Sequence, residues 1–278
     1  KIVSQFDNVT LILPDDQPTP NTQDLATKTQ DLRPKTQNPK TVTVIKGDIR
    51  NEEVVELATN GVDAVVHLAA ITGVPDSVKK PKITYQVNVT GTLNLLEACR
   101  DNEVEKFVLA SSNAIVGEKE PPIHEKMVPE PISPYGSSKL AGESLCKAYS
   151  SCYGIKANAL RFSNVYGSYS NHKNSVVMKF IKRAKSGKTL PIYGDGEQTR
   201  DFIYAADIAK AVALTLDTDL AGEVFQVGTG KETKILELAK RIQSLANKKH
   251  SQPNIVHKEP RPGEIYTNFT DPNKIQNL

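Results

Sequence analysis

The sequence predicts an α/β fold with a parallel sheet that is covered by helices on both faces. Short apolar runs rich in β-branched residues alternate with longer segments of helical period over most of the 278 residues. Apolar residues make up 38% and charged residues 24% of the chain, which is enough to build a core. No apolar run reaches the roughly 20 residues that a membrane-spanning helix needs, so we expect no membrane association.

The first 167 residues contain the pattern of a Rossmann-like doubly wound sheet. Strands are expected at 9–13, 42–45, 64–68, 106–110 and 157–162, and helices at 52–59, 83–101 and 135–153. The last helix has Ser133 to cap it and Pro134 in its first turn. Residues 14–40 are polar and rich in Thr, Gln, Asn and Pro, which indicates a loop. Strand and helix alternate as in a parallel sheet.

The regular alternation of strands and helices changes after residue 167. Expected elements are a helix at 175–186, strands at 189–193 and 201–204, a helix at 206–215, a strand at 223–227 and a helix at 235–247. We interpret 168–278 as a smaller α/β substrate-binding region, partly interleaved with the first domain, at the sheet edge where such folds bind ligands. Gly228-Thr229-Gly230 lacks the third glycine of a dinucleotide-binding turn, so we interpret it as a tight turn.

Charge and cysteine usage narrow the classes of function. The chain has 35 Lys and Arg against 32 Asp and Glu, a net charge of +3 that is too balanced for a nucleic-acid-binding surface. Cys99, Cys146 and Cys152 lie in helical stretches without the spacing of metal ligands. We therefore expect reduced thiols, no metal site, no nucleic-acid partner and a cytoplasmic location.

A Tyr-x-x-x-Lys pair occurs twice, as Tyr135/Lys139 and as Tyr169/Lys173. The second lies in a loop-like stretch, whereas the first lies at a helix start, where residues four apart share a face. A phenol, with a pKa of about 10, is a poor base unless a cation stabilises the phenolate, and Lys139 could do this. The alternative is an exposed pair worth a few tenths of a kcal/mol, as is usual for i,i+4 neighbours.

Ser111 and Ser112 follow the expected strand 106–110 directly and so lie at its C-terminal end. A hydroxyl there can orient a substrate hydroxyl and share its proton, and simple turn chemistry is the alternative. Together with Tyr135 and Lys139, a serine at this strand end predicts a site in which a phenol removes the proton of a substrate hydroxyl while hydride leaves the carbon that carries it.

Eight segments in order give the chain a specific resemblance. They are GDIRN (47–51), HLAA (67–70), NVTGTLNLLEA (88–98), SSNAIVG (111–117), SPYGSSK (133–139), LRFSNVYG (160–167), YGDGEQTRDFIY (193–204) and PRPGE (260–264). The chain resembles the extended short-chain dehydrogenase/reductase family, most closely its nucleotide-sugar epimerases of the UDP-glucose 4-epimerase type. The resemblance implies NAD as cofactor and a UDP-sugar as substrate.

The resemblance also implies roles for particular residues. The catalytic residues would be Ser112, Tyr135 and Lys139. Those that bind NAD would be Asp48 and Ile49 beside the adenine, together with Leu68, Ala69, Ala70, Asn88, Ser111, Tyr135, Lys139 and Phe162. Substrate would contact Ser112, Asn164, Val176, Pro191, Tyr193, Arg200, Arg261 and Glu264, with the two arginines on the phosphates. From the residues alone, Asn88 could instead be a helix cap, Arg200 a surface charge and Arg261 a loop cation. A homodimer would form through helices 83–101 and 135–153.

Departures from the family pattern refine these expectations. Sugar dehydratases and decarboxylases of the family place an acid just after the strand-end Ser or Thr, but Asn113 and Ala114 stand here, which favours epimerisation. The small Asn268 at a gate position suggests that N-acetylated sugars are accepted as well as UDP-glucose and UDP-galactose.

Two alternatives stay open. One is another extended reductase acting on nucleotide sugars, such as a UDP-glucuronate epimerase or a keto-sugar reductase. The other is a non-catalytic nucleotide-sugar-binding protein. It is suggested by the sequence of the NAD-binding domain, 1–167, which lacks the family's first strand and its G-x-x-G-x-x-G turn and is therefore expected to be N-terminally incomplete.

Overall fold

A four-stranded parallel sheet forms the centre of the protein. The computed structural model describes residues 8–13, 41–168, 170, 175–246, 254–260 and 265–278. The sheet has the order β10 (Val224–Val227), β5 (Lys156–Phe162), β4 (Lys106–Ser112) and β3 (Ala64–His67), with every neighbouring pair parallel. The predicted strands and the α/β class are confirmed.

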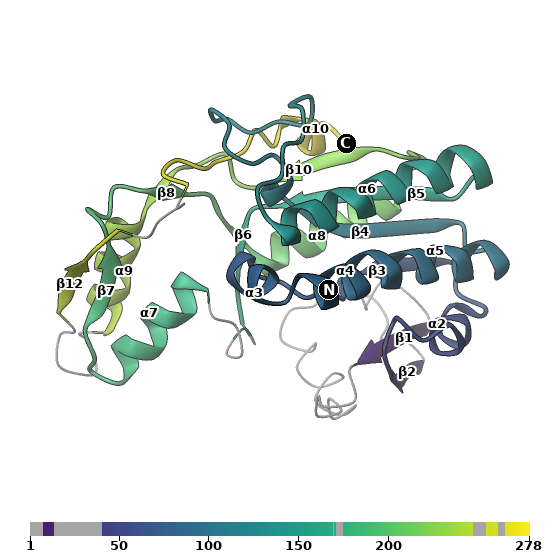
Figure 1. Cartoon of the computed structure of the whole chain (residues 1–278), viewed down its shortest axis with the longest axis horizontal. Helices are drawn as coiled ribbons and strands as arrows, with labels where there is room; N and C mark the ends of the chain where they lie inside the picture. Colours follow the sequence, from purple (N-terminus) through teal and green to yellow (C-terminus); the bar gives the residue numbers. More distant parts are fainter. Residues whose placement is uncertain (1–7, 14–40, 169, 171–174, 247–253, 261–264) are drawn as a thin grey trace, which may run out of the picture.

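Helices cover both faces of this sheet. One face carries α5 (Gly91–Asp101) and α6 (Pro134–Tyr153), and the other carries α8 (Ala205–Leu216). Because side chains alternate along β4, Phe107 packs into the core under α5 and α6, whereas Val108 packs into the core under α8. Two separate apolar cores on opposite faces confirm the doubly wound, Rossmann-like arrangement seen in Figure 1.

A second, two-stranded parallel sheet pairs β1 (Asn8–Leu13) with β2 (Thr41–Lys46). Helix α2 (Glu52–Thr59) follows, capped by the Asn51 side chain, which accepts a hydrogen bond from the Glu53 amide. This helix packs on α5 and on β1, so it connects the small sheet to the main body. The predicted loop at 14–40 lies outside the described residues.

The helix expected at 83–101 is longer and less regular than predicted. It begins as α4 (Pro81–Tyr85), passes through a five-residue π-helix η3 (Gln86–Thr90) and continues as α5. A short helix, α3 (Val74–Lys79), precedes it and was not expected. The π-helical turn brings the buried Asn88 side chain toward both the loop after β3 and α6.

A smaller group of elements has a core of its own. Helices α7 (Val176–Lys185) and α9 (Ile235–Ala246) pack with β7 (Leu190–Tyr193), which pairs in parallel with β12 (Ile255–Lys258). Figure 1 shows this group beside the main sheet. In contrast, α8 and β10 return to the main sheet although they follow residue 167. The division at 167 stays a prediction.

Short strands lie along the connections between the two groups. They are β6 (Asn164–Tyr166) with β9 (Phe202–Tyr204), which run parallel, and β8 (Thr199–Arg200) with β11 (Thr233–Lys234), which run antiparallel. The chain ends in α10 (Asn273–Gln276), which packs on β10. Of these, β6, β8, β11 and α10 were not predicted, and neither was β12. They are short or exposed and carry no periodic apolar signal.

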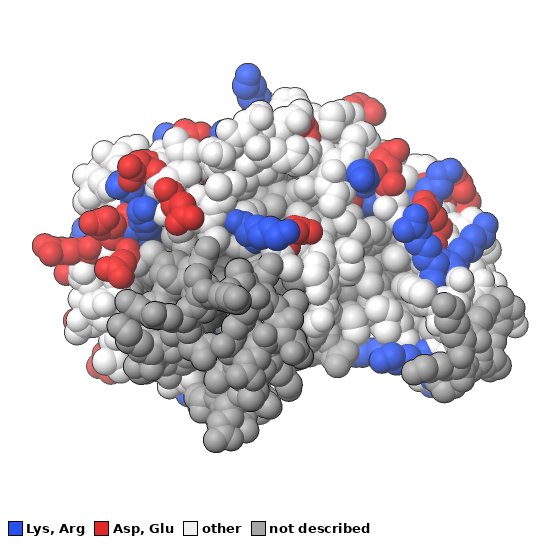
Figure 2. All heavy atoms as spheres, turned by 180° about the vertical axis from the view of Figure 1, so that it is seen from behind, with Lys and Arg blue, Asp and Glu red and all other residues white. Residues whose placement is uncertain are grey.

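The surface agrees with the balanced composition. On the face shown in Figure 2, Lys and Arg side chains lie in mixed groups with Asp and Glu. Among the described residues, no helix is both long enough and apolar enough to cross a membrane.

Candidate active site

Three predicted catalytic residues meet at the C-terminal end of β4. Ser112 is the last residue of this strand, and Tyr135 and Lys139 lie one turn apart at the start of α6. The Ser133 hydroxyl caps α6 by accepting from the Gly136 amide at 3.1 Å, and Pro134 occupies the first turn as predicted. The Ser112 hydroxyl lies close enough to the Tyr135 phenol to oppose the effect of burial on the pKa of that phenol. The local sequence thus aims the phenol at the strand-end serine.

Burial sets the protonation of this group. It raises the pKa of the Tyr135 phenol, which the hydrogen bond from Ser112 only partly offsets. It lowers the pKa of Lys139 to about 8, while the Lys139 Nζ donates to the Ala110 carbonyl at 2.8 Å. The phenol is therefore protonated near neutral pH, and the ammonium is held beside the end of β4. That Lys139 stabilises a phenolate stays a prediction.

A buried ion pair lies one helical turn beyond Lys139. Arg161 Nη2 of β5 donates to Glu143 Oε2 of α6 at 2.8 Å. Both side chains are about 5% exposed or less. The Ser111 hydroxyl also donates to Glu143, at 2.5 Å. Ser111 is a predicted cofactor contact, but its hydroxyl is turned to Glu143, so such a contact would fall to its backbone. Glu143 and Arg161 were not singled out in the sequence, although charged residues inside a buried strand and on an apolar helix face were a usable signal.

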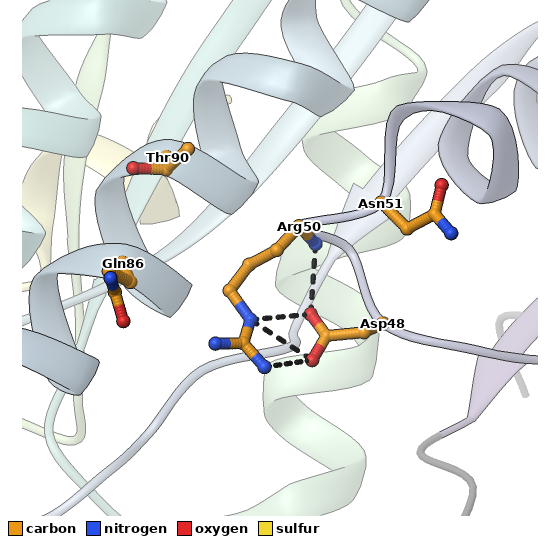
Figure 3. A pocket seen from close by; sticks show the side chains of 5 residues that line it. All are labelled: Asp48, Arg50, Asn51, Gln86 and Thr90. Atoms are coloured by element: carbon orange, nitrogen blue, oxygen red, sulfur yellow. Dashed lines mark hydrogen bonds and ion pairs between the residues drawn. The ribbon is translucent and has the colours of Figure 1, made fainter.

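A pocket of about 460 Å³ lies between the turn after β2 and the π-helix (Figure 3). It is lined by Asp48, Arg50, Asn51, Gln86 and Thr90. The Arg50 guanidinium donates to Asp48 at 2.5–3.0 Å, and this bonding holds the pKa of the carboxyl below its ordinary value. Arg50 was not singled out in the sequence. Ile49 is buried against Gly91, where a Cβ would lie 2.5 Å from its Cδ1.

The other predicted cofactor residues lie just after β3, in the π-helix and at the end of β5. Leu68 and Ala69 are exposed and Ala70 is half-buried just after β3. Asn88 is buried and binds both the amide and the carbonyl of Ile71, at 2.8 and 3.0 Å, and Ser138 at 3.0 Å. Asn88 is therefore not a helix cap. Its side chain holds the loop after β3 against α6 by hydrogen bonds. Phe162 ends β5 and packs against the core under α8.

These residues fit a dinucleotide at both of its ends. The pocket around Asp48 offers carboxylate acceptors to an amino-purine, and the other end offers the Tyr135 hydroxyl and the Lys139 ammonium. Between the two ends, Leu68 is 58% exposed, which is unusual for an apolar side chain at a strand end and suits a ligand lying over it.

The predicted substrate residues gather around the short connecting strands. Asn164 begins β6 with its side chain exposed, and its amide donates to the Asp201 carbonyl at 2.9 Å. Arg200, the neighbour of Asp201, is half-buried, and its Nη1 donates to the Thr199 carbonyl at 2.6 Å. The structure thus brings Asn164 and Arg200 to one place.

The remaining substrate residues lie on the smaller group or outside the described part. Val176 begins α7, and Pro191 and Tyr193 lie on β7 with half-buried side chains. The Tyr193 carbonyl accepts a hydrogen bond from Gln198 Nε2 at 2.7 Å, and Gln198 lies two residues before Arg200. Arg261 and Glu264 lie outside the described residues. Asn268, the predicted gate residue, is half-buried.

A doubly wound parallel sheet with Ser, Tyr and Lys together at a strand end defines the class of short-chain dehydrogenase/reductase enzymes. The chain belongs to the NAD dependent epimerase/dehydratase family, whose model matches residues 12–228. The expectations of an enzyme and of NAD as its cofactor are confirmed by this assignment, as is the family resemblance.

Individual relatives agree with the family. A putative UDP-glucose 4-epimerase of Methanocaldococcus jannaschii is 38% identical over 249 residues, which are 87% of this chain and 79% of that protein. The crystal structure of a UDP-glucose 4-epimerase of Thermotoga maritima with UDP-glucose matches with a TM-score of 0.82 at 28% identity, over 97% of this chain and 91% of that one. A UDP-glucose 4-epimerase of Thermus thermophilus in complex with NAD matches with a TM-score of 0.80 at 31% identity, over 97% and 92%. The chain is thus similar to nucleotide-sugar epimerases.

Proposed function

We propose that the protein interconverts the C4 epimers of a UDP-hexose, UDP-glucose and UDP-galactose first and their N-acetylated counterparts as well. The observation that carries the proposal is that the Tyr135 phenol and the Ser112 hydroxyl meet at the end of β4, with the buried Lys139 one turn further along α6. NAD supplies the hydride acceptor and donor when it is bound.

The chain's own residues move the proton and hold the sugar. Tyr135 takes the C4 hydroxyl proton in one direction and returns it in the other, with Ser112 orienting the hydroxyl. The Lys139 ammonium stabilises the phenolate that forms, because a cation acts strongly where water is excluded. Asn164 and Arg200 hold the diphosphate, together with Arg261, while the sugar turns over between two half-reactions.

Cofactor and nucleotide contacts complete the proposal. Asp48 and Ile49 would hold the adenine of NAD, and Leu68, Ala69, Ala70, Ser111, Lys139 and Phe162 would hold the rest of it, with Asn88 fixing the loop after β3. Val176, Pro191 and Tyr193 border the uracil and ribose, and Glu264 binds the ribose.

Asn113 supports epimerisation over elimination. This residue follows Ser112, where a dehydratase needs an acid, and its side chain is buried with Nδ2 donating to the Ser163 hydroxyl at 3.1 Å. Neither its chemistry nor its direction supplies a second proton donor to the sugar, and Ala114 next to it has no polar group.

Product analysis tests the proposal against its competitors. The purified protein is incubated with UDP-glucose, UDP-N-acetylglucosamine, UDP-glucuronate and dTDP-glucose, and products are resolved by chromatography and NMR. We expect UDP-galactose from UDP-glucose, and its N-acetylated analogue from the second substrate. Conversion of UDP-glucuronate alone, or formation of a 4-keto-6-deoxy sugar, would contradict the proposal in favour of a different enzyme of the family. Binding of UDP-glucose without turnover would favour the non-catalytic alternative.

We also propose a homodimer through α5 and α6. Leu93 on α5 and Tyr153 on α6 are exposed, and the Arg100 guanidinium lies 5.3 Å from the Tyr153 ring centroid. An apolar surface on two adjacent helices suits a second copy of the same helices. Light scattering should give twice the chain mass for the wild type and a monomer for Leu93→Arg.

A further inference from the structure

Asp201 is a fully buried carboxylate between β8 and β9. Five neutral donors hydrogen-bond to it: the Thr229 amide at 2.9 Å and hydroxyl at 2.6 Å, the Gly230 amide at 3.1 Å, and the Thr270 amide at 3.3 Å and hydroxyl at 2.7 Å. A buried anion is tolerated only with such dense bonding. The Gly-Thr-Gly turn after β10 thus wraps a carboxylate of the protein itself.

The donors come from segments that are far apart in sequence. Thr229 and Gly230 follow β10 of the main sheet, Thr270 precedes α10, and Asp201 lies on the connection toward the smaller group. Figure 1 places β6 and β8 between the main sheet and the group formed by α7, α9, β7 and β12. Asp201 therefore joins three segments where the chain passes from one group to the other.

The same hydrogen bonds continue to the catalytic strand. The Thr270 hydroxyl lies 3.4 Å from the Ser163 hydroxyl, which accepts from Asn113 Nδ2 at 3.1 Å. Asn113 directly follows Ser112. In the other direction, the Asp201 carbonyl accepts from the Asn164 amide, and Arg200 is its immediate neighbour. Hydrogen bonds thus link Asn113, the residue after Ser112, to the backbone beside Asn164 and Arg200, two of the predicted diphosphate contacts.

Gly228 shows how closely these segments approach. A Cβ there would lie 2.1 Å from the Thr270 hydroxyl oxygen and 2.4 Å from Asp201 Oδ2. No side chain fits without moving Asp201 or Thr270, because real Cβ atoms do not come so close. The glycine is required by contact with the carboxylate.

We infer that Asp201 is a positioning residue for the substrate diphosphate: its buried carboxylate, bound by Thr229, Gly230 and Thr270, holds Arg200 and Asn164 in register with Ser112. This rests on the proposed function. Loosening the carboxylate lets β8, β9 and the segment before α10 shift relative to β4. Substrate is then held less tightly, while the proton-transfer geometry of Tyr135 and Ser112, which lie on α6 and β4, is retained.

Thr270→Val is the test variant, because it removes one hydroxyl donor and keeps the side-chain shape. We expect KM for the UDP-sugar and Kd for UDP to rise roughly 5- to 30-fold, as for loss of a hydrogen bond to a charged group, with kcat unchanged. Thr270→Ser should restore both constants. Asp201→Asn should give a larger rise in the same two constants. If Asp201→Asn does not fold, Thr270→Val decides the question.

Thr215→Val is the matched control. Thr215 is equally buried, and its hydroxyl donates to the Ala211 carbonyl at 2.9 Å within α8, away from Asp201. It should lower Tm without changing KM or Kd. Wild-type KM and Kd in Thr270→Val, or an equal rise of KM in Thr215→Val, would overturn the inference.

Hydrogen exchange separates failure of this inference from failure of the proposed function. If the wild-type protein converts none of the UDP-sugars, the proposed function fails, but the amides of 199–204 and of Asn164 still report on Asp201. They should exchange faster in Thr270→Val than in the wild type and in Thr215→Val. Equal exchange in the two variants would contradict a positioning role whatever the activity.

Discussion

Lys139 and Arg200 are both cations of the proposed site, but their surroundings differ. Lys139 is 4% exposed, its pKa is lowered to about 8 by burial, and its one hydrogen bond goes to the Ala110 carbonyl. Arg200 is half-buried on a two-residue strand beside the fully buried Asp201. Lys139 is thus itself desolvated. Arg200 stays within reach of solvent, and the desolvated group is its neighbour Asp201.

This difference agrees with the roles proposed for the two cations. Stabilising a phenolate is most effective where water is excluded, and it costs stability to hold an ammonium there. Capturing a diphosphate from solution requires an accessible guanidinium, so rigidity has to come from a neighbour. The surroundings of Lys139 are therefore expected to lower the stability of the fold, whereas the surroundings of Arg200 are expected to depend on buried hydrogen bonds.

Removal of the phenol should have the largest effect. Tyr135→Phe is expected to lower kcat by about 10²- to 10⁴-fold, the range for loss of a general acid/base, with KM little changed. Tyr149→Phe on the same helix is the control, because its hydroxyl binds Glu97 at a distance from Ser112. Steady-state kinetics of both variants measure this. Wild-type kcat in Tyr135→Phe would remove Tyr135 from the mechanism.

Stability should respond most to the ion pair behind the catalytic residues. Glu143→Ala leaves Arg161 buried without its anion and is expected to cost about 3–5 kcal/mol of unfolding free energy. Glu237→Ala, which breaks the exposed pair with Arg241 on α9, should cost about 0.5 kcal/mol or less. Urea unfolding of both variants gives the comparison. Equal losses would mean that burial does not distinguish the two pairs.

Lys139 should be a destabilising residue. A pKa lowered from 10.5 to about 8 means that folding costs on the order of 3 kcal/mol at pH values below 8. Between pH 8 and 10.5 the unfolded chain binds more protons, so stability rises with pH and the cost disappears. Lys139→Met should therefore be more stable than the wild type near pH 7, by about 2 kcal/mol after loss of the bond to Ala110 is allowed for.

The measurement is the difference in unfolding free energy between Lys139→Met and the wild type from pH 6 to 11. The difference should shrink above pH 8, and the variant should be nearly inactive throughout. A pH-independent difference would show that the ammonium is not the source of the cost.

Most of the fold and the grouping of Ser112, Tyr135 and Lys139 were predictable because their signals are local. Strands β3 and β4 contain continuous apolar runs, and Ser133 and Pro134 fix the start of α6 next to Tyr135. The bonds of Asp201 were not predictable, because its partners lie 28 and 69 residues away and are chosen by tertiary packing. The pairing of Glu143 with Arg161, which are 18 residues apart on different elements, was not predictable either, although the sequence marked each as a charge within a largely apolar element.

Truncation of Arg200 should weaken substrate binding and sharpen the comparison with Lys139. Arg200→Ala is expected to raise KM for the UDP-sugar roughly 10- to 100-fold, the cost of a charge-assisted hydrogen bond to phosphate, with kcat retained. Arg241→Ala, on the exposed face of α9, is the control and should leave KM unchanged.

Salt dependence separates anchoring of a phosphate from a merely structural role of Arg200, whose Nη1 also bonds to the backbone. An accessible guanidinium that binds a dianion is screened by salt, so KM of the wild type should rise between 0.01 and about 0.5 M ionic strength. The rise should be weaker in Arg200→Ala, because one of the screened contacts is gone. If the guanidinium only tethered the backbone of β8, KM would differ between the proteins but rise equally with salt, and the diphosphate contact would have to be assigned elsewhere.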